Sequence, residues 1–405
     1  MSIWQHVRYS TPGVPDRIHL NAAGCSLQSE QTKERVLAYL EKEQSRGGYE
    51  HALDCQEDLN APYKELSTLL NCREEEIAIV SSATEAWLQI IQGLSWGWTK
   101  DDCIVTSESE YGTNYLTYLQ IQKRIGVGIV VVPETEEYDI DLVHLERVLM
   151  SEGDGNSKKP VLISITHIPT SSGRVYDAAG VGRLAKKYRV PFLLDACQSV
   201  GQICTDVKEI QCDFLSGTGR KFLRAPRGTG FLYCSKDYLD AFEPASIDVA
   251  SASWTNSSDY KLVGTCRRFE KYEMSYAARV GLAVALRECN NLGIHIIEKR
   301  ILHLAEYLRN ALEHNVPGLL LRDKGTRLCG IVSFTVQGIT ADELYALLQS
   351  EQVSVSVSRI TSSRLDFEKR HLEQVVRASV HVYNSEQELD RFVSILRHCG
   401  IHHVA

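Results

Sequence analysis

A lysine that follows a turn rich in glycine and hydroxyl groups is the residue of this sequence best suited to covalent chemistry. Lys221 ends the segment 216–221, which reads SGTGRK. A lysine amine attacks a carbonyl carbon only when part of it is deprotonated, and burial or a nearby positive charge such as that of Arg220 lowers its pKa. Thr218 and Arg220 could also bind an anion. The segment therefore predicts a lysine that binds an aldehyde, with an exposed Lys-Arg pair on a loop as the alternative.

An aspartate ends the apolar run 192–195. A carboxylate at the carboxyl end of a parallel strand lies where α/β sheets bind ligands. Beside a heteroaromatic ring nitrogen, Asp195 would keep that nitrogen protonated and make the ring an electron sink. Gln198 could hydrogen-bond the same ligand. The alternative is that Asp195 caps the next helix.

A third segment, 79–86, passes from an apolar run into a helical pattern through small hydroxyl residues. Amides at a helix N-terminus, together with the hydroxyls of Ser82 and Thr84, form an anion site that suits a phosphate. The alternative is an ordinary helix cap followed by an acidic first turn.

The elements that must position these segments alternate between short apolar runs and helical periodicity, which is typical of an α/β fold with a mostly parallel sheet. Strands are expected at 77–81, 103–106, 128–132, 161–166, 192–195, 214–217 and 230–234, with helices at 84–93, 114–125, 141–150 and 178–188. A smaller α+β domain should follow, with helices from 275 and at 297–314, 341–350 and 386–396, and strands at 330–335, 353–358 and 375–381. We expect an N-terminal segment, 1–69, whose helix at 30–46 packs with the small domain, a large domain, 70–260, and a small domain with its linking helix, 261–405.

The composition of the chain excludes several function classes. It has 405 residues and a net charge of −8, with no dense basic face for nucleic acid. No apolar run approaches the ~20 residues that cross a bilayer, and the first residues lack the basic flank and apolar core of a signal peptide. The twelve cysteines form no C-x-x-C pair, so no metal site is expected. We expect a cytoplasmic protein without membrane or nucleic-acid partners.

Taken together, the three segments resemble in order and spacing the class V aminotransferase family of fold type I pyridoxal-phosphate enzymes. This family includes cysteine desulfurases, C–S lyases and isopenicillin-epimerase-like proteins. The resemblance extends from the segment 18–24, IHLNAAG, to the segment 377–384, RASVHVYN. It implies a large cofactor-binding domain, a smaller α+β domain and a homodimer. Tyr272 and Glu273 stand where many desulfurases have a Gly-Thr pair that reaches the partner subunit, so that contact differs here.

The resemblance also implies roles for individual residues. Lys221 would be the Schiff-base lysine of pyridoxal 5′-phosphate, and Asp195 the partner of the pyridine nitrogen. The other cofactor contacts would be Gln198 and Thr170 near the phenolic oxygen, Ala83, Thr84, Thr218 and Arg220 at the phosphate, and Tyr111 over the ring, where desulfurases have a histidine. Arg377 would bind the substrate carboxylate, with Asn21, Ala23 and Arg359 as further substrate contacts. An ion pair is the alternative for Arg377, and a surface ion pair for Arg359.

One absence narrows the reaction that the resemblance implies. Desulfurases carry a mobile cysteine shortly before the Arg377 strand, and this chain has no cysteine between Val353 and Arg377. An amino acid would form an external aldimine and then a carbanion, and a lyase that breaks a C–S or other β/γ bond is the favoured outcome. An aminotransferase, an epimerase and a bond-forming enzyme remain alternatives, as does a non-catalytic interaction protein on the same scaffold. The G-x-G-x-x-A outline at 180–185 would suit a dinucleotide fold, but no apolar strand precedes it, so an ordinary helix is expected there.

Overall fold

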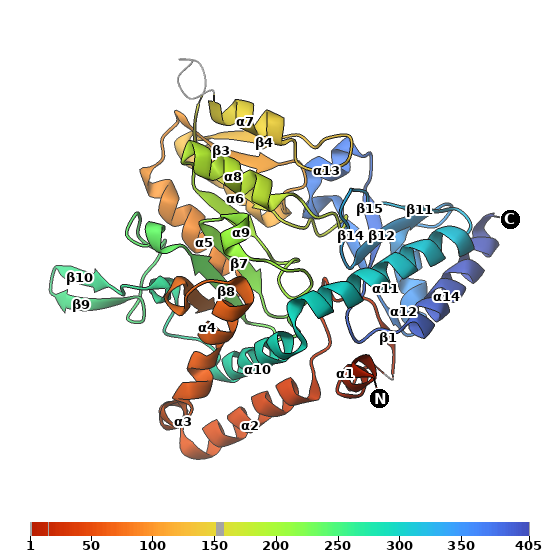
Figure 1. Cartoon of the computed structure of the whole chain (residues 1–405), viewed down its shortest axis with the longest axis horizontal. Coiled ribbons are helices and arrows are strands. Elements are labelled where there is room, and N and C mark those ends of the chain that lie inside the picture. Colours follow the sequence, from red (N-terminus) through yellow and green to blue (C-terminus); the bar gives the residue numbers. More distant parts are fainter. Residues whose placement is uncertain (1, 15, 151–157, 405) are drawn as a thin grey trace.

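A seven-stranded sheet forms the centre of the larger part of the molecule (Figure 1). The computed structural model describes residues 2–14, 16–150 and 158–404. The strand order is β2 (Ile77–Val80), β8 (Gly230–Cys234), β7 (Phe214–Thr218), β6 (Phe192–Asp195), β5 (Lys159–Thr166), β3 (Asp102–Ser107) and β4 (Gly128–Val132). Only β8 runs against the others. Strands β2, β6, β7 and β8 are buried along their whole length. The apolar runs in β2 and β8 predict this burial, whereas β7 also buries Ser216 and Thr218.

Helices cover both faces of this sheet (Figure 1). The principal ones are α5 (Ala83–Leu94), α6 (Gly112–Ile125), α7 (Leu142–Met150) and α8 (Ala178–Tyr188). Helix α8 begins after Asp177, whose carboxylate accepts the Gly180 amide at 2.8 Å. A Cβ on Gly182 would lie 1.8 Å from the Ile210 carbonyl oxygen, so close packing accounts for that glycine. The G-x-G-x-x-A outline is therefore part of an ordinary helix, as expected.

The C-terminal part forms a second, antiparallel sheet. Its order is β11 (Leu319–Leu321), β12 (Ile331–Val336), β15 (Gln374–Ser379) and β14 (Ser356–Arg359). Its helices are α11 (Ile294–Asn315), α12 (Ala341–Ser350), α13 (Arg364–Lys369) and α14 (Glu386–Val404), and α10 (Tyr276–Leu292) leads into it from the large sheet. The single strand expected at 353–358 is wrong in one respect, because β13 (Val353–Ser354) pairs with β1 (Ile18–His19) and only β14 pairs with β15.

The N-terminal residues are divided between these parts. Helices α2 (Glu30–Arg46) and α4 (Gln56–Leu70) lie along α10, whereas β1 joins the small domain through β13 (Figure 1). Helices α1 (Ile3–Tyr9) and α3 (Gly48–Asp54) complete this segment. Among the described helices, none combines the length and apolar character that a bilayer crossing demands.

A two-stranded hairpin projects from the body of the molecule (Figure 1). Strands β9 (Ala252–Asn256) and β10 (Asp259–Leu262) pair only with each other in the described sheets. Trp254, on this hairpin, is 81% exposed.

Candidate active site

The candidate site is a cavity at the carboxyl ends of β5, β6 and β7. Strand register places Thr166 beside Asp195, and Asp195 beside Ser216, at this edge. The cavity is lined by Ser82, Ala83, Thr84, Tyr111, Thr166, Ile168, Thr170, Asp195, Cys197, Gln198, Thr218, Arg220 and Lys221. Ten of these residues are candidates from the sequence, so chain positions 82 to 221 converge on one site as expected for an α/β sheet.

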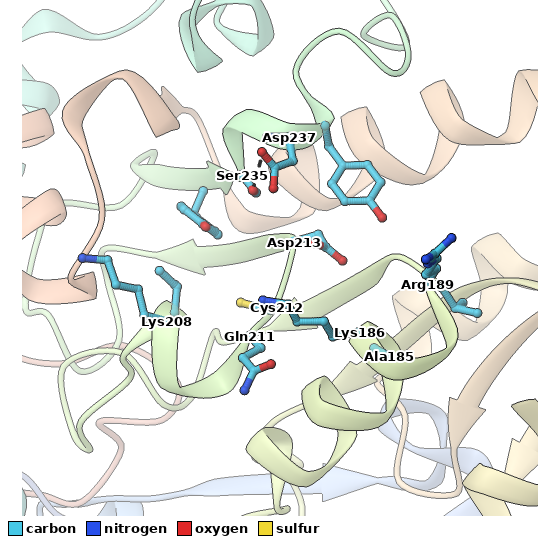
Figure 2. A pocket seen from close by; sticks show the side chains of 13 residues that line it. Ala185, Lys186, Arg189, Lys208, Gln211, Cys212, Asp213, Ser235 and Asp237 are labelled. Atoms are coloured by element: carbon cyan, nitrogen blue, oxygen red, sulfur yellow. Dashed lines mark hydrogen bonds between the residues drawn. The ribbon is translucent and has the colours of Figure 1, made fainter.

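A larger cavity, of about 550 Å³, lies at the opposite ends of the same strands and contains none of these candidates (Figure 2). Lys186, Arg189, Asp213 and Asp237 line it. It is a broad hollow with charges of both signs, and Asp213 already accepts the Phe192 amide at 2.8 Å. Size alone favours this cavity, but reactive chemistry favours the smaller one, which combines an amine, a carboxylate and free amides.

Lys221 is partly buried and lines the candidate site. Within the described part of the chain, no hydrogen bond involves its Nζ. Burial lowers the pKa of Lys221, and the charges of Arg220 and Arg377 act in the same direction, against Cys197 and Asp195. The amine is therefore easier to deprotonate than that of a surface lysine, as a carbonyl-binding lysine requires.

Asp195 is buried at the end of β6 with both carboxylate oxygens hydrogen-bonded. Its Oδ1 accepts the Cys197 amide and its Oδ2 accepts the Asn114 side-chain amide, each at 3.0 Å. The helix-cap alternative is not what the structure shows, because these donors are a turn amide and a distant side chain. A carboxylate so placed can bind a protonated ring nitrogen in the cavity.

The N-terminus of α5 supplies amides suited to a phosphate. Ser82 Oγ accepts the Glu85 amide at 3.1 Å, and the Ser82 carbonyl accepts the Ala86 amide. The amides of Ala83 and Thr84 keep no acceptor within the described residues and line the cavity. A Cβ on Gly230 would lie 2.4 Å from the Ser82 carbonyl carbon, so a glycine there lets β8 approach this turn.

Thr218 and Arg220 also line the cavity. Thr218 donates to the Thr229 carbonyl at 3.4 Å, a long hydrogen bond. Arg220 donates to the Gly24 carbonyl, which ties the lysine turn to the N-terminal segment. Together with the α5 amides, these side chains form a donor-rich anion site.

Tyr111, Thr170 and Gln198 line the cavity as well. Tyr111 is 38% exposed, and its amide donates to Glu110 Oε1 at 2.7 Å. Gln198 Nε2 donates to Thr170 Oγ1 at 3.0 Å and to the Ala23 carbonyl at 3.1 Å. Gln198 Oε1 is buried without a partner among the described residues, so it is free to meet a ligand.

Arg377 is a buried cation without a described carboxylate partner. Its guanidinium donates to the Thr170 carbonyl at 3.1 Å and to the Thr170 hydroxyl, and it lies 3.5 Å from Asn21 Oδ1. Its Nε has no partner in the described part of the structure. Burial lowers the pKa of Arg377 to about 10, so the group remains charged at neutral pH. The ion-pair alternative is thus absent here, and a buried cation of this kind suits an anionic ligand.

Two further substrate candidates have other surroundings. Ala23 is buried and is not among the residues that line the cavity, but its carbonyl accepts from Gln198, which does line it, and its amide donates to Ser379. Arg359 is exposed and pairs with Asp342 at 2.6 Å, the surface ion pair that was its alternative. The structure does not bring Arg359 into the cavity, and its substrate role stays a prediction without structural support.

Sequence reasoning missed several residues of the site. Thr166, Ile168 and Cys197 line the cavity, and Glu110 and Asn114 lie behind it. No local pattern in the sequence marks the last two, because Glu110 precedes the helix that begins at Gly112 and a polar residue at a helix start, such as Asn114, is usually solvated. In the described residues no three His, Cys, Asp or Glu side chains gather as a metal-binding group.

This donor set fits pyridoxal 5′-phosphate. Lys221 offers an amine for its aldehyde, Asp195 a carboxylate for its ring nitrogen, and the α5 amides with Arg220 a site for its phosphate. The partnerless Gln198 Oε1 adds a free polar atom at the wall.

Comparisons with known proteins agree with this assignment. The sequence profile of the family described as aminotransferase class-V matches residues 18–392. A probable cysteine desulfurase of Pyrococcus abyssi is 26% identical over 400 residues, which cover 98% of this chain and 97% of that protein. A probable cysteine desulfurase of Methanothermobacter thermautotrophicus is 27% identical, with 95% of each chain covered.

Solved structures show the same fold. The apo cysteine desulfurase of Thermococcus onnurineus superposes with a TM-score of 0.90 at 24% identity, over 99% of both chains. The cystine C–S lyase C-DES, in complex with its product cysteine persulfide, superposes with a TM-score of 0.83 at 20% identity, over 96% of this chain and 99% of that one. Since the family profile spans nearly the whole chain and the site holds the matching donors, this protein belongs to the class-V aminotransferase family of pyridoxal-phosphate-dependent enzymes.

Proposed function

We propose that this protein is a carbon–sulfur lyase that acts on cysteine-type amino acids and releases the sulfur as a small molecule. The observation that carries the proposal is the buried Arg377 cation, which has no described carboxylate partner and is near enough to Lys221 to lower its pKa. If the guanidinium of Arg377 binds the α-carboxylate of an amino acid, it brings that amino acid close to Lys221. The names of the desulfurase relatives and of the C-DES structure support the sulfur chemistry.

The residues divide the work. Bound pyridoxal phosphate supplies an electron sink for the substrate carbanion. Lys221, whose pKa is lowered by burial, takes the proton from the substrate Cα. Asp195 holds the ring-nitrogen proton, and Arg377 orients the carboxylate so that the Cα–H bond faces the lysine. Tyr111 stands at the open wall, where it can cover the ring.

The sulfur leaves with the electron pair of the Cβ–S bond, and hydrolysis of the remaining fragment gives pyruvate and ammonia. With cystine and water, the balanced products are cysteine persulfide, pyruvate and ammonia. With cysteine, the sulfur product is hydrogen sulfide.

The segment that holds a mobile cysteine in desulfurases is anchored here. Ser363 donates to the Glu110 carbonyl at 3.1 Å, and Asp366 pairs with Arg174 at 2.8 Å, with 1% of each of these two side chains exposed. Phe367 is fully buried beside them. A mobile segment that carries sulfur out of the site would have to break the buried pair of Asp366 and Arg174. We therefore expect this segment to stay in place during turnover.

The cavity lining includes one cysteine, and its setting does not suit a sulfur acceptor. Burial and the charge of Asp195 raise the pKa of the Cys197 thiol. A thiol kept protonated is a weak nucleophile. Sulfur that leaves the substrate is therefore expected to depart as sulfide or as a persulfide of the product.

The test is product analysis with cysteine and with cystine. We expect pyruvate and ammonia in equal amounts, with sulfide or cysteine persulfide, and no protein-bound persulfide by mass spectrometry of the enzyme after turnover. Alanine as the main product together with a protein persulfide would show a desulfurase instead. A keto acid without ammonia would show transamination, and loss of optical activity without bond cleavage would show an epimerase.

We also propose a homodimer. An isolated two-stranded ribbon is marginally stable in water, yet β9 and β10 project with Trp254 exposed, which suits a ribbon covered by a second copy. Light scattering should give twice the chain mass of 45.5 kDa, and Trp254→Glu should shift the protein toward the monomer. A monomeric wild type would refute the proposal.

A further inference from the structure

Two buried carboxylates, one in the wall of the candidate site and one behind it, share one amide group. Asn114 Nδ2 donates to Glu110 Oε1 and to Asp195 Oδ2, both at 3.0 Å. All three residues are buried. A side-chain amide has two hydrogens, so each hydrogen of Asn114 serves one carboxylate. We propose that Asn114, held by Glu110, is a positioning residue that orients the Asp195 carboxylate toward the ring nitrogen of pyridoxal phosphate. This inference rests on the proposed function, because it needs that cofactor in the cavity.

Glu110 is the fixed end of this chain of hydrogen bonds. Its Oε1 also accepts from the Thr166 hydroxyl and from the Tyr111 amide, the latter at 2.7 Å. Its Oε2 accepts from Thr106 Oγ1 at 2.9 Å and Tyr118 Oη at 3.1 Å. Five donors leave Glu110 no freedom to swing, so Asn114 is held at one end and can orient Asp195 at the other.

Asp195 depends on Asn114 for its orientation. The Cys197 amide, in the same turn, donates to Oδ1. Among the described residues, the donor to Oδ2 is the side-chain amide of Asn114. Without Asn114, the carboxylate could rotate about its Cβ–Cγ bond, and a buried oxygen would lose its donor. Both effects weaken an ion pair with a ring nitrogen, which needs a defined direction.

The surroundings of Glu110 would also accept a neutral group of the same shape. Burial raises the pKa of Glu110, and the charge of Asp195 acts in the same direction, against the hydrogen bonds from Thr166, Asn114 and the Tyr111 amide. The hydroxyls of Thr106 and Tyr118, which meet Oε2, can accept as well as donate a hydrogen bond.

This arrangement makes Glu110→Gln a conservative replacement. The glutamine oxygen would accept the three donors that meet Oε1, and its nitrogen would donate to the hydroxyls of Thr106 and Tyr118. Asn114 would then stay in place. Asn114→Ala and the similarly sized Asn114→Leu remove the shared amide, and one of them suffices if the other fails to fold.

The experiment compares the wild type with these variants by two readouts besides activity. One is the dissociation constant of pyridoxal phosphate, and the other is the ¹⁵N chemical shift of ring-labelled cofactor in the holoenzyme. We expect Asn114→Ala or Asn114→Leu to weaken cofactor binding about tenfold, as loss of one hydrogen bond to a charged group implies. The ring nitrogen signal should move toward that of the unprotonated ring, whereas Glu110→Gln should match the wild type in both readouts.

The matched control is Asn290→Ala. Asn290 donates to the carboxylate of Glu65 at 2.7 Å on the distant helix pair α10 and α4, so its loss should alter the melting temperature without moving the ring nitrogen signal. A folded Asn114 variant with wild-type affinity and a protonated ring would overturn this inference alone. A wild type that does not bind pyridoxal phosphate would overturn the proposed function and this inference with it.

Discussion

Replacement of Lys221 by alanine is expected to remove the visible absorption band of the lysine-bound cofactor and to lower amino-acid turnover by about 10⁴-fold, near the upper range for loss of a positioned acid–base group. The reason is the setting of its amine, which has no described hydrogen-bond partner and whose pKa is lowered by burial. Among the described residues, Lys221 is the lysine that lines the cavity. Absorption spectra of protein reconstituted with pyridoxal phosphate, together with steady-state rates, measure both effects.

Lys186→Ala is the matched control. Lys186 lines the larger cavity at the opposite strand ends (Figure 2), so its loss should leave the band and the rate unchanged. A band that survives in Lys221→Ala and disappears in Lys186→Ala would place the cofactor in the larger cavity and refute the assignment. A wild type that stays colourless with added pyridoxal phosphate would refute it as well.

The large sheet was predictable because the sequence itself marks where several of its strands begin and end. β6 and β8 are uninterrupted apolar runs ended by polar residues, and both match their expected bounds. Helix α4 was not predicted, because Pro62 lies inside it and its first residue follows Cys55, which makes no side-chain cap. The hairpin β9–β10 was also missed, because its exposed polar strands lack an apolar face.

The candidate site was predictable where a local pattern carries the chemistry. Asp195 ends a strand and Lys221 follows the next one, so parallel pairing alone brings them to one edge. Arg359 of β14 pairs with Asp342 of α12, and no local sequence pattern predicts an ion pair between residues so far apart in the chain. The same holds for Asn114, since a polar residue at a helix start is usually solvated, and only the fold places Asp195 against it.

Arg377→Ala is the second change with a large expected effect. We expect kcat/KM for cysteine or cystine to fall by about 10³-fold, because removal of one partner from a buried charge pair costs about 2–5 kcal/mol. The dissociation constant of the cofactor should stay within about twofold, since the hydrogen bonds of Arg377 go to Thr170 and Asn21 and none goes to the turn at Ser82. Arg377→Lys should recover part of the loss, because a lysine keeps the charge but not the bidentate fork.

Arg359→Ala separates a buried substrate cation from an exposed one. Arg359 is also an arginine of the second sheet, but its guanidinium is exposed and paired with Asp342, and exposed pairs contribute about 0–1 kcal/mol. Steady-state kinetics should therefore show an unchanged kcat/KM. A large loss in Arg359→Ala would restore its predicted contact with the substrate. Equal losses of cofactor and substrate binding in Arg377→Ala would instead assign that arginine to the integrity of the cavity, because a carboxylate clamp affects the amino acid alone.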